Sequence, residues 1–127
     1  MLFQMLEILY PRRCAVCDEI EVTGKGICPL CKDKVHVAGE PACKKCGKPL
    51  VDERKEFCTD CGKKHHVYTQ GKAVFVYEGG IRNSMYRFKY GNKREYAEFY
   101  ANAALEKYGV WLNKIKAEVL IPIPMYS

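Results

Sequence analysis

Four CxxC pairs dominate the first half of the chain. The gaps between successive pairs hold 10, 11 and 11 residues, and the second half contains no cysteine. A CxxC turn lets two thiolates reach one metal ion, and two such turns complete the tetrahedral thiolate site that zinc favours. The spacing therefore predicts two zinc ions. The predicted ligands are Cys14, Cys17, Cys28, Cys31, Cys43, Cys46, Cys58 and Cys61.

The spacing leaves open which pairs share an ion, because the three gaps are nearly equal. Sequential pairing would join the first two pairs and the last two, whereas cross-brace pairing would interleave them. We favour sequential pairing, since each half is then a self-contained ribbon and the repeat arises from two stacked copies. Four thiolates leave no open coordination position, so we expect structural sites. His36, His65 and His66 are expected to lie outside the ligand sets.

Three other uses of the cysteines compete with zinc. Disulfides require an oxidising compartment, yet the start MLFQMLEILYPRRC lacks the basic region and the cleavage site of a secretory signal. Nor does any apolar run approach the roughly 20 residues that span a bilayer. We therefore expect a cytoplasmic protein with reduced thiols. An iron–sulfur cluster usually has denser or less symmetric spacing, and a redox CxxC belongs in a βαβ unit.

Composition changes near Val67, which predicts one domain over residues 1–66 and another over 67–127. In the first, residues 2–10 form a short apolar helix that must bury itself, and Pro11 ends it. The segments EVTGKG and KPLVDERKEF suit short hairpins that need metal in place of a core. The second domain has four expected elements: a strand over 68–77, a helix over 80–90, a helix over 94–111 and a buried parallel strand in EVLIPIP.

The stretch RNSMYRFKYGNKREY interleaves cations with aromatic residues. Proteins that bind single-stranded nucleic acid stack bases on such aromatics and hold phosphates with the cations. The alternative is a helix whose aromatics, with Met85 and Phe88, face the core while the cations face water. Net charge does not decide between these two interpretations, because the formal charge of +6 falls to about +2 once eight thiolates hold two zinc ions. The candidate nucleic-acid contacts are Arg82, Arg87, Lys89, Lys93 and Arg94.

No catalytic set is visible in the sequence. It has no glycine-rich phosphate loop and no HExxH motif, and zinc would leave no cysteine free to act as a nucleophile.

The order of these parts resembles a known family. An apolar start ending in YPRRCAVC, the double CxxC repeat, the block YEGGIRNSMYRFKYGNKREYA and the terminal VLIPIP are similar to the N-terminal half of the competence protein ComF family. That family is amidophosphoribosyltransferase-like and is linked to DNA uptake in natural transformation. The resemblance implies a small α+β chain: a double zinc ribbon of short β-hairpins with CxxC knuckles, then the start of a type I phosphoribosyltransferase-like α/β domain.

The same resemblance implies a function and its partners. In the family, a loop with an acidic pair and a Thr/Gly-rich turn binds phosphoribosyl pyrophosphate, and this chain ends at Ser127 before it. We expect a fragment or a split gene product that is inactive as a transferase alone. It would assist the handling of single-stranded DNA and contact the DNA-uptake machinery. Alternatively, the ribbons are only a structural or protein-docking module of an incomplete phosphoribosyltransferase-family protein.

The terminal strand carries one further expectation. A lone EVLIPIP strand without parallel neighbours exposes an edge, so we expect a homodimer through this strand or partial disorder of residues 118–127.

Overall fold

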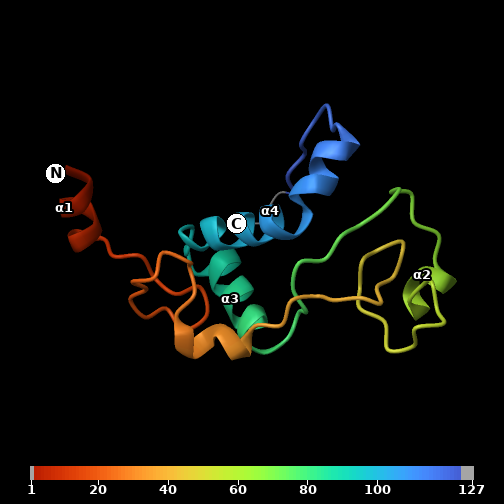
Figure 1. Cartoon of the computed structure of the whole chain (residues 1–127), viewed down its shortest axis with the longest axis horizontal. Coiled ribbons are helices and arrows are strands. Elements are labelled where there is room, and N and C mark those ends of the chain that lie inside the picture. The colour runs from red at the N-terminus through yellow and green to blue at the C-terminus, as the bar shows by residue number, and fades with distance from the viewer. Residues whose placement is uncertain (1, 124–127) are drawn as a thin grey trace.

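The computed structural model describes residues 2–123, and the regular elements in this range are helical (Figure 1). They are α1 (Leu2–Leu9), the 3-10 helix η1 (Pro29–Lys34), α2 (Thr59–Lys63), α3 (Gly79–Tyr90) and α4 (Tyr96–Ile115). Within these residues, β structure is limited to isolated antiparallel bridges that join Arg13 to Ile20, Val37 to Phe75 and Ala42 to Pro49. The expected α/β domain is therefore not seen in this part of the chain.

The helices expected from apolar spacing are confirmed. α1 ends just before Pro11, α3 begins one residue earlier than expected, and α4 runs four residues further, to Ile115. The expected burial of α1 is wrong, because Ile8 and Tyr10 are each 80 % exposed. None of the helices within residues 2–123 combines the length and apolar character that crossing a membrane requires.

Neither expected strand forms in the part of the chain that the structure describes. The segment over 68–77 is extended, but only residues 36–38 lie beside it, with hydrogen bonds from Ala38 N to Val74 O and from Val76 N to His36 O. Because the partner segment has only three residues, the two segments form a single bridge and cannot form a longer ladder. The EVLIPIP segment has no strand as far as residue 123, and Val119, Leu120, Ile121 and Ile123 are 71–92 % exposed. Without neighbouring strands in this range, its apolar character does not lead to burial. The last residue of EVLIPIP lies outside the described residues. So do residues 124–127 of the segment 118–127, for which partial disorder was expected.

The core forms where the first cysteine-rich segment meets α3 and α4. Its buried members are Ala15, Ile81, Tyr96 and Phe99, with Ile27, Val35, Phe75, Phe88 and Tyr100 packed against them. Two glycines permit the close approach. A Cβ on Gly26 would lie 2.9 Å from Phe99 Cβ, and one on Gly80 would lie 2.9 Å from Val16 Cγ1. The core thus includes residues from both sides of the expected boundary near Val67. The division of the chain into two domains stays a prediction.

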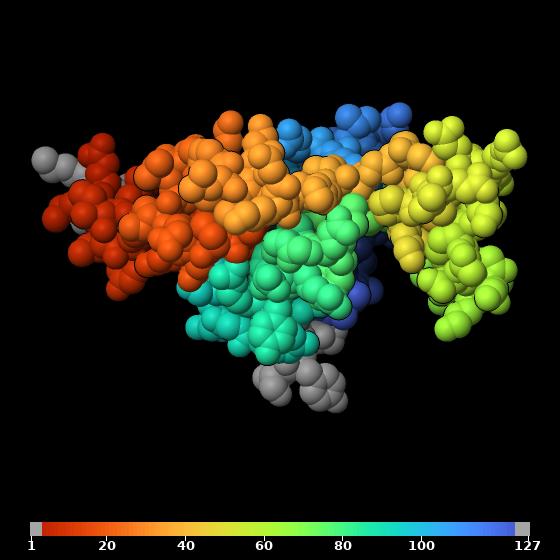
Figure 2. All heavy atoms as spheres, turned by 90° about the horizontal axis from the view of Figure 1, so that it is seen from below, coloured from red at the N-terminus to blue at the C-terminus, as the bar shows by residue number. Residues whose placement is uncertain are grey.

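The second cysteine-rich segment lies apart, in a distal lobe of residues 41–72 that contains α2 (Figure 1). A notch separates this lobe from the helical body (Figure 2). Two extended connections, residues 36–38 and 73–76, join the two parts and are held by α4. Lys107 Nζ donates to Ala38 O and, at 3.1 Å, to Ala73 O, and Tyr108 Oη donates to Ala73 O at 2.7 Å.

Candidate metal centres

The structure gathers the eight cysteines into two clusters, which follow sequential pairing. One cluster contains Cys14, Cys17, Cys28 and Cys31, and the other contains Cys43, Cys46, Cys58 and Cys61. Within each cluster the four Sγ atoms lie within 4.8 Å of one another. No other group of histidine, cysteine and carboxylate side chains in the described residues meets this criterion.

The sulfur positions fit a tetrahedral zinc ion. Zn–S bonds of about 2.3 Å place neighbouring sulfurs about 3.8 Å apart, whereas a disulfide requires about 2.05 Å. The distance from Cys17 Sγ to Cys28 Sγ is 3.7 Å, and the distance from Cys46 Sγ to Cys58 Sγ is also 3.7 Å. All eight cysteines are free. The two clusters are therefore consistent with two zinc ions.

Both clusters begin with the same knuckle. Asp18 N donates to Cys14 O at 2.9 Å, and Gly47 N donates to Cys43 O at 2.8 Å. The residue that closes the turn has a positive φ in each case, 66° at Asp18 and 77° at Gly47. The turn directs the two sulfurs of each CxxC towards the same point, which explains why this spacing yields ligand pairs.

Backbone N–H groups stabilise the first thiolate of each cluster, Cys14 and Cys43. Cys28 N donates to Cys14 Sγ at 3.3 Å and Val16 N donates to it at 3.4 Å. Burial raises the pKa of Cys14 and of Cys43, but backbone hydrogen bonds outweigh it and lower the two pKa values to about 7 and about 6.

Two thiols, Cys31 and Cys61, need a cation in order to ionise. Burial and the neighbouring thiols raise the pKa of Cys31, and likewise of Cys61, to about 12. Four thiolates in one cluster therefore repel one another, and a divalent ion would offset that repulsion and cross-link the chain. With four sulfur ligands it would have no position for a substrate, so its contribution is structural.

The comparisons with known proteins agree with this geometry. Residues 5–62 match the family model described as Double zinc ribbon domain. The N-terminal half of the chain is a double zinc ribbon. We call residues 12–35 the first ribbon and residues 41–63 the second ribbon. The match ends before α3 and α4. Neither the curated proteins nor the solved structures gave a significant match.

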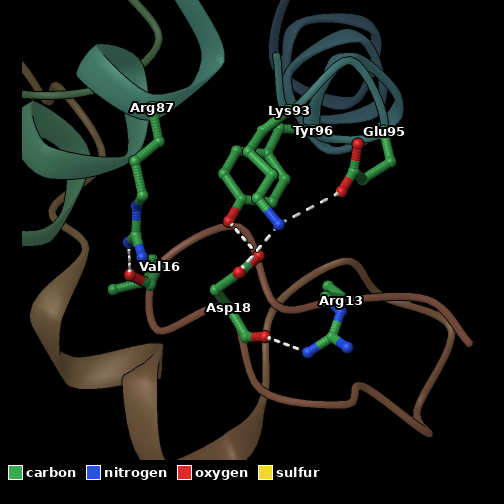
Figure 3. Close-up of polar contacts among 7 residues, drawn as sticks. All are labelled: Arg13, Val16, Asp18, Arg87, Lys93, Glu95 and Tyr96. Carbon is green, nitrogen blue, oxygen red and sulfur yellow. Dashed lines mark hydrogen bonds and ion pairs between the residues drawn. The ribbon is translucent and has the colours of Figure 1, made fainter. Parts of the chain in front are cut away.

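Asp18 attaches the first ribbon to the helices (Figure 3). Its carboxylate accepts a hydrogen bond from Tyr96 Oη at 2.6 Å and lies 2.8 Å from Lys93 Nζ. Burial raises the pKa of Asp18, but these two partners outweigh it and lower the pKa below its usual value. Nearby, the Arg87 guanidinium donates to Val16 O. The knuckle that presents Cys14 and Cys17 is thus fixed to both α3 and α4.

Within residues 2–123, the second ribbon has no hydrogen bond or ion pair of this kind to α3 or α4. At the position of Asp18 it has Gly47, which lies against residues 71–73: an added Cβ would meet Ala73 N at 2.8 Å. Gly71 N donates to Lys45 O at 2.6 Å, which ties the same segment to the second ribbon. Each ribbon is therefore held through the residue that follows its first CxxC.

The histidines lie outside both clusters, as expected. His66 stacks on Tyr68 with ring centroids 5.2 Å apart, and His36 Nδ1 lies 2.8 Å from Glu78 Oε1. His65 is exposed and belongs to neither cluster.

The candidate nucleic-acid residues divide into two groups. Arg87 and Lys93 are partly buried and bind Val16 and Asp18 within the chain. Arg82, Lys89 and Arg94 are exposed. Their role in binding nucleic acid stays a prediction.

Tyr86 and Tyr90 belong to the aromatic residues that the stretch RNSMYRFKYGNKREY offers for base stacking. They lie on the exposed side of α3, away from the buried Ile81 and Ser84, with rings 5.1 Å apart. Their spacing of four residues, off the register of Ile81 and Phe88, is the signal that identifies them.

Proposed function

We propose that this zinc-binding double ribbon protein is a ComF-like accessory factor that assists the handling of single-stranded DNA in natural transformation. The observation that carries the proposal is the pair of tyrosines on α3. Tyr86 and Tyr90 are each 66 % exposed and their rings are adjacent. Arg82 and Lys89 are exposed on the same helix.

This arrangement has the chemistry of a single-strand platform. Stacking of a base on an aromatic side chain contributes about 1–3 kcal/mol and tolerates any base. The neighbouring cations attract phosphates and make binding depend on salt. The resemblance to the ComF family supports DNA as the ligand. The thiolate sites require reduced cysteines, so the same proposal places the protein in the cytoplasm.

Binding of a fluorescently labelled oligothymidine at two salt concentrations tests the proposal. We expect binding that weakens as salt increases, and a loss of tenfold or more in affinity for the double variant Tyr86→Ala/Tyr90→Ala. Tyr10→Ala is the control, since this exposed tyrosine follows α1. Zinc content and far-UV circular dichroism verify that each variant is folded. Absence of salt-dependent binding by the wild type, or equal binding by the double variant and the control, would overturn the proposal.

A second candidate function is protein docking, with the double ribbon as a structural module of a phosphoribosyltransferase-family protein. The exposed apolar side chains of α1 and of residues 119–123 favour it. Partners of this kind would be the DNA-uptake machinery or a second copy of the chain. Light scattering tests the homodimer: we expect a dimer that Ile121→Ser/Ile123→Ser converts to a monomer. A monomeric wild type would exclude a homodimer through this segment.

A further inference from the structure

A groove of about 340 Å³ lies between the first ribbon and the first turn of α4. Its volume is at the lower end of the range of ligand pockets, about 300–1,000 Å³. One wall is the tight turn of the first ribbon, residues 24–26, and the other is residues 94–99 with Asn102. The charged side chains that line it are Arg12, Arg13, Lys25, Arg94, Glu95 and Glu98.

The wall formed by the turn is held in place from within. The buried Glu21 carboxylate accepts hydrogen bonds from Thr23 N, from Thr23 Oγ1 and, at 3.0 Å, from Gly26 N. Gly26 itself lies against Phe99 of α4, with no space for a Cβ. Lys25, between these anchored positions, is therefore presented at the groove by a fixed backbone.

The opposite wall is fixed as well. The Asp18 contacts with Tyr96 and Lys93 hold the start of α4 against the first ribbon (Figure 3). Arg94 lies between Lys93 and Tyr96 in sequence and is exposed. Both walls are thus positioned before any ligand arrives, which lowers the entropy cost of binding.

The groove has an excess of two positive charges, because four cations and two carboxylates line it. Arg12 Nη1 lies 3.1 Å from Glu98 Oε1, and Arg13 Nη1 donates to Asp18 O at 2.9 Å. Within the described residues, Lys25 and Arg94 form no ion pair. These two cations are available to an anion, and arginine matches the oxygen geometry of phosphate.

We propose that this groove binds the phosphodiester backbone of the single strand whose bases stack on Tyr86 and Tyr90. The inference rests on the proposed function and adds the path of the strand. Arg94 follows Tyr90 by four residues and lies within the connection from α3 to α4, which is beside the first ribbon (Figure 1). A strand that leaves the tyrosine pair along this connection reaches the groove.

The slope of affinity against salt concentration is the test, measured by fluorescence anisotropy with a labelled 15-nucleotide oligothymidine. Each phosphate contact on a single strand contributes about 0.7 to the slope of log K against log salt. We expect Lys25→Gln/Arg94→Gln to reduce the slope by about 1.4. The matched control, Lys63→Gln/Lys64→Gln, removes the same charge from the distal lobe, where both lysines are exposed, and should reduce the slope less.

The outcomes separate this inference from the proposed function. An unchanged slope in Lys25→Gln/Arg94→Gln, or a change equal to the control's, would overturn the groove while Tyr86→Ala/Tyr90→Ala still tests the platform. No binding by the wild type would overturn both. Inorganic phosphate, added at constant ionic strength, should not displace the strand; displacement at submillimolar phosphate would assign the groove to free phosphate and reject the backbone path.

Discussion

The Tyr96 hydroxyl donates a hydrogen bond to the Asp18 carboxylate at 2.6 Å, and this contact joins a zinc knuckle to helix α4. Asp18 adopts a φ of 66°, in the left-handed region where glycine is favoured, and the second ribbon has glycine at the same position. The first ribbon accepts a conformation of higher energy there because the side chain is needed for docking. The two ribbons therefore share the geometry of their metal ligands and differ in which part of the chain the knuckle contacts.

Tyr96→Phe tests this contact. Removing a hydrogen bond to a charged acceptor should reduce the free energy of unfolding by about 1–2 kcal/mol, because Lys93 remains paired with Asp18. Chemical denaturation of the zinc-loaded protein measures the change. Tyr10→Phe, at an 80 % exposed ring, should have no effect. Equal stabilities for the two variants would show that the Asp18–Tyr96 contact does not hold the ribbon.

The two zinc sites should differ in their effect on the helices. Cys14→Ser should remove one zinc ion and lower the thermal stability of α3 and α4, since the first ribbon packs against them. Cys43→Ser should also remove one ion but leave the helical signal nearly unchanged. Native mass spectrometry counts the ions, and far-UV circular dichroism follows the helices. Equal loss of helix in both variants would contradict the asymmetry.

Gly47→Ala should weaken the second ribbon. A φ of 77° costs a non-glycine residue about 1–2 kcal/mol, and the added Cβ would lie 2.8 Å from Ala73 N. The expected result is faster loss of one zinc ion to a chelator. The matched control is Gly109→Ala in α4, where the added Cβ would meet nothing within 4 Å beyond its chain neighbours and the adjacent backbone of its own helix. This control variant should stabilise the helix by about 0.5–1 kcal/mol. Slower zinc loss in Gly47→Ala would refute the strain argument.

Glu21→Gln tests the turn that presents Lys25. Burial raises the pKa of Glu21, but hydrogen bonds from Thr23 and Gly26 outweigh it and lower the pKa below the usual value of a glutamate. A lowered carboxyl pKa contributes stability that is fully present above the unfolded pKa and is lost as pH falls through the folded pKa. The variant should therefore be less stable than the wild type by about 1–3 kcal/mol.

That difference should stay constant between about pH 8 and about pH 5.5, where the carboxylate is ionised in both states. Denaturation of both zinc-loaded proteins across this range measures it. A difference that grows as pH falls from 7 to 5.5 would mean that burial, and not hydrogen bonding, sets the pKa of Glu21, because a raised carboxyl pKa makes the wild type more stable on acidification.

The metal sites were predictable because their chemistry is local. A CxxC turn brings two thiols together through backbone geometry alone, and the repeat of two self-contained ribbons favoured sequential pairing, which the clusters follow. Helices α1, α3 and α4 were also predictable, because each has apolar residues or stop signals at helical spacing.

Burial and pairing were not predictable, because they depend on partners. The segments over 68–77 and 118–123 have strand composition, but a ladder requires a neighbouring strand of similar length. The roles of Asp18 and Glu21 were also missed. The position after the first CxxC identifies Asp18 only when it is compared with Gly47, and Glu21 has no sequence signal of its own.

The count and identity of the bound metal test the central claim most directly. Native mass spectrometry of the purified chain, combined with elemental analysis, should show two zinc ions per chain, no iron and eight cysteines without disulfide bonds. One ion per chain, iron in place of zinc, or oxidised cysteine pairs in the native protein would contradict the two closed thiolate sites on which the fold of both ribbons depends.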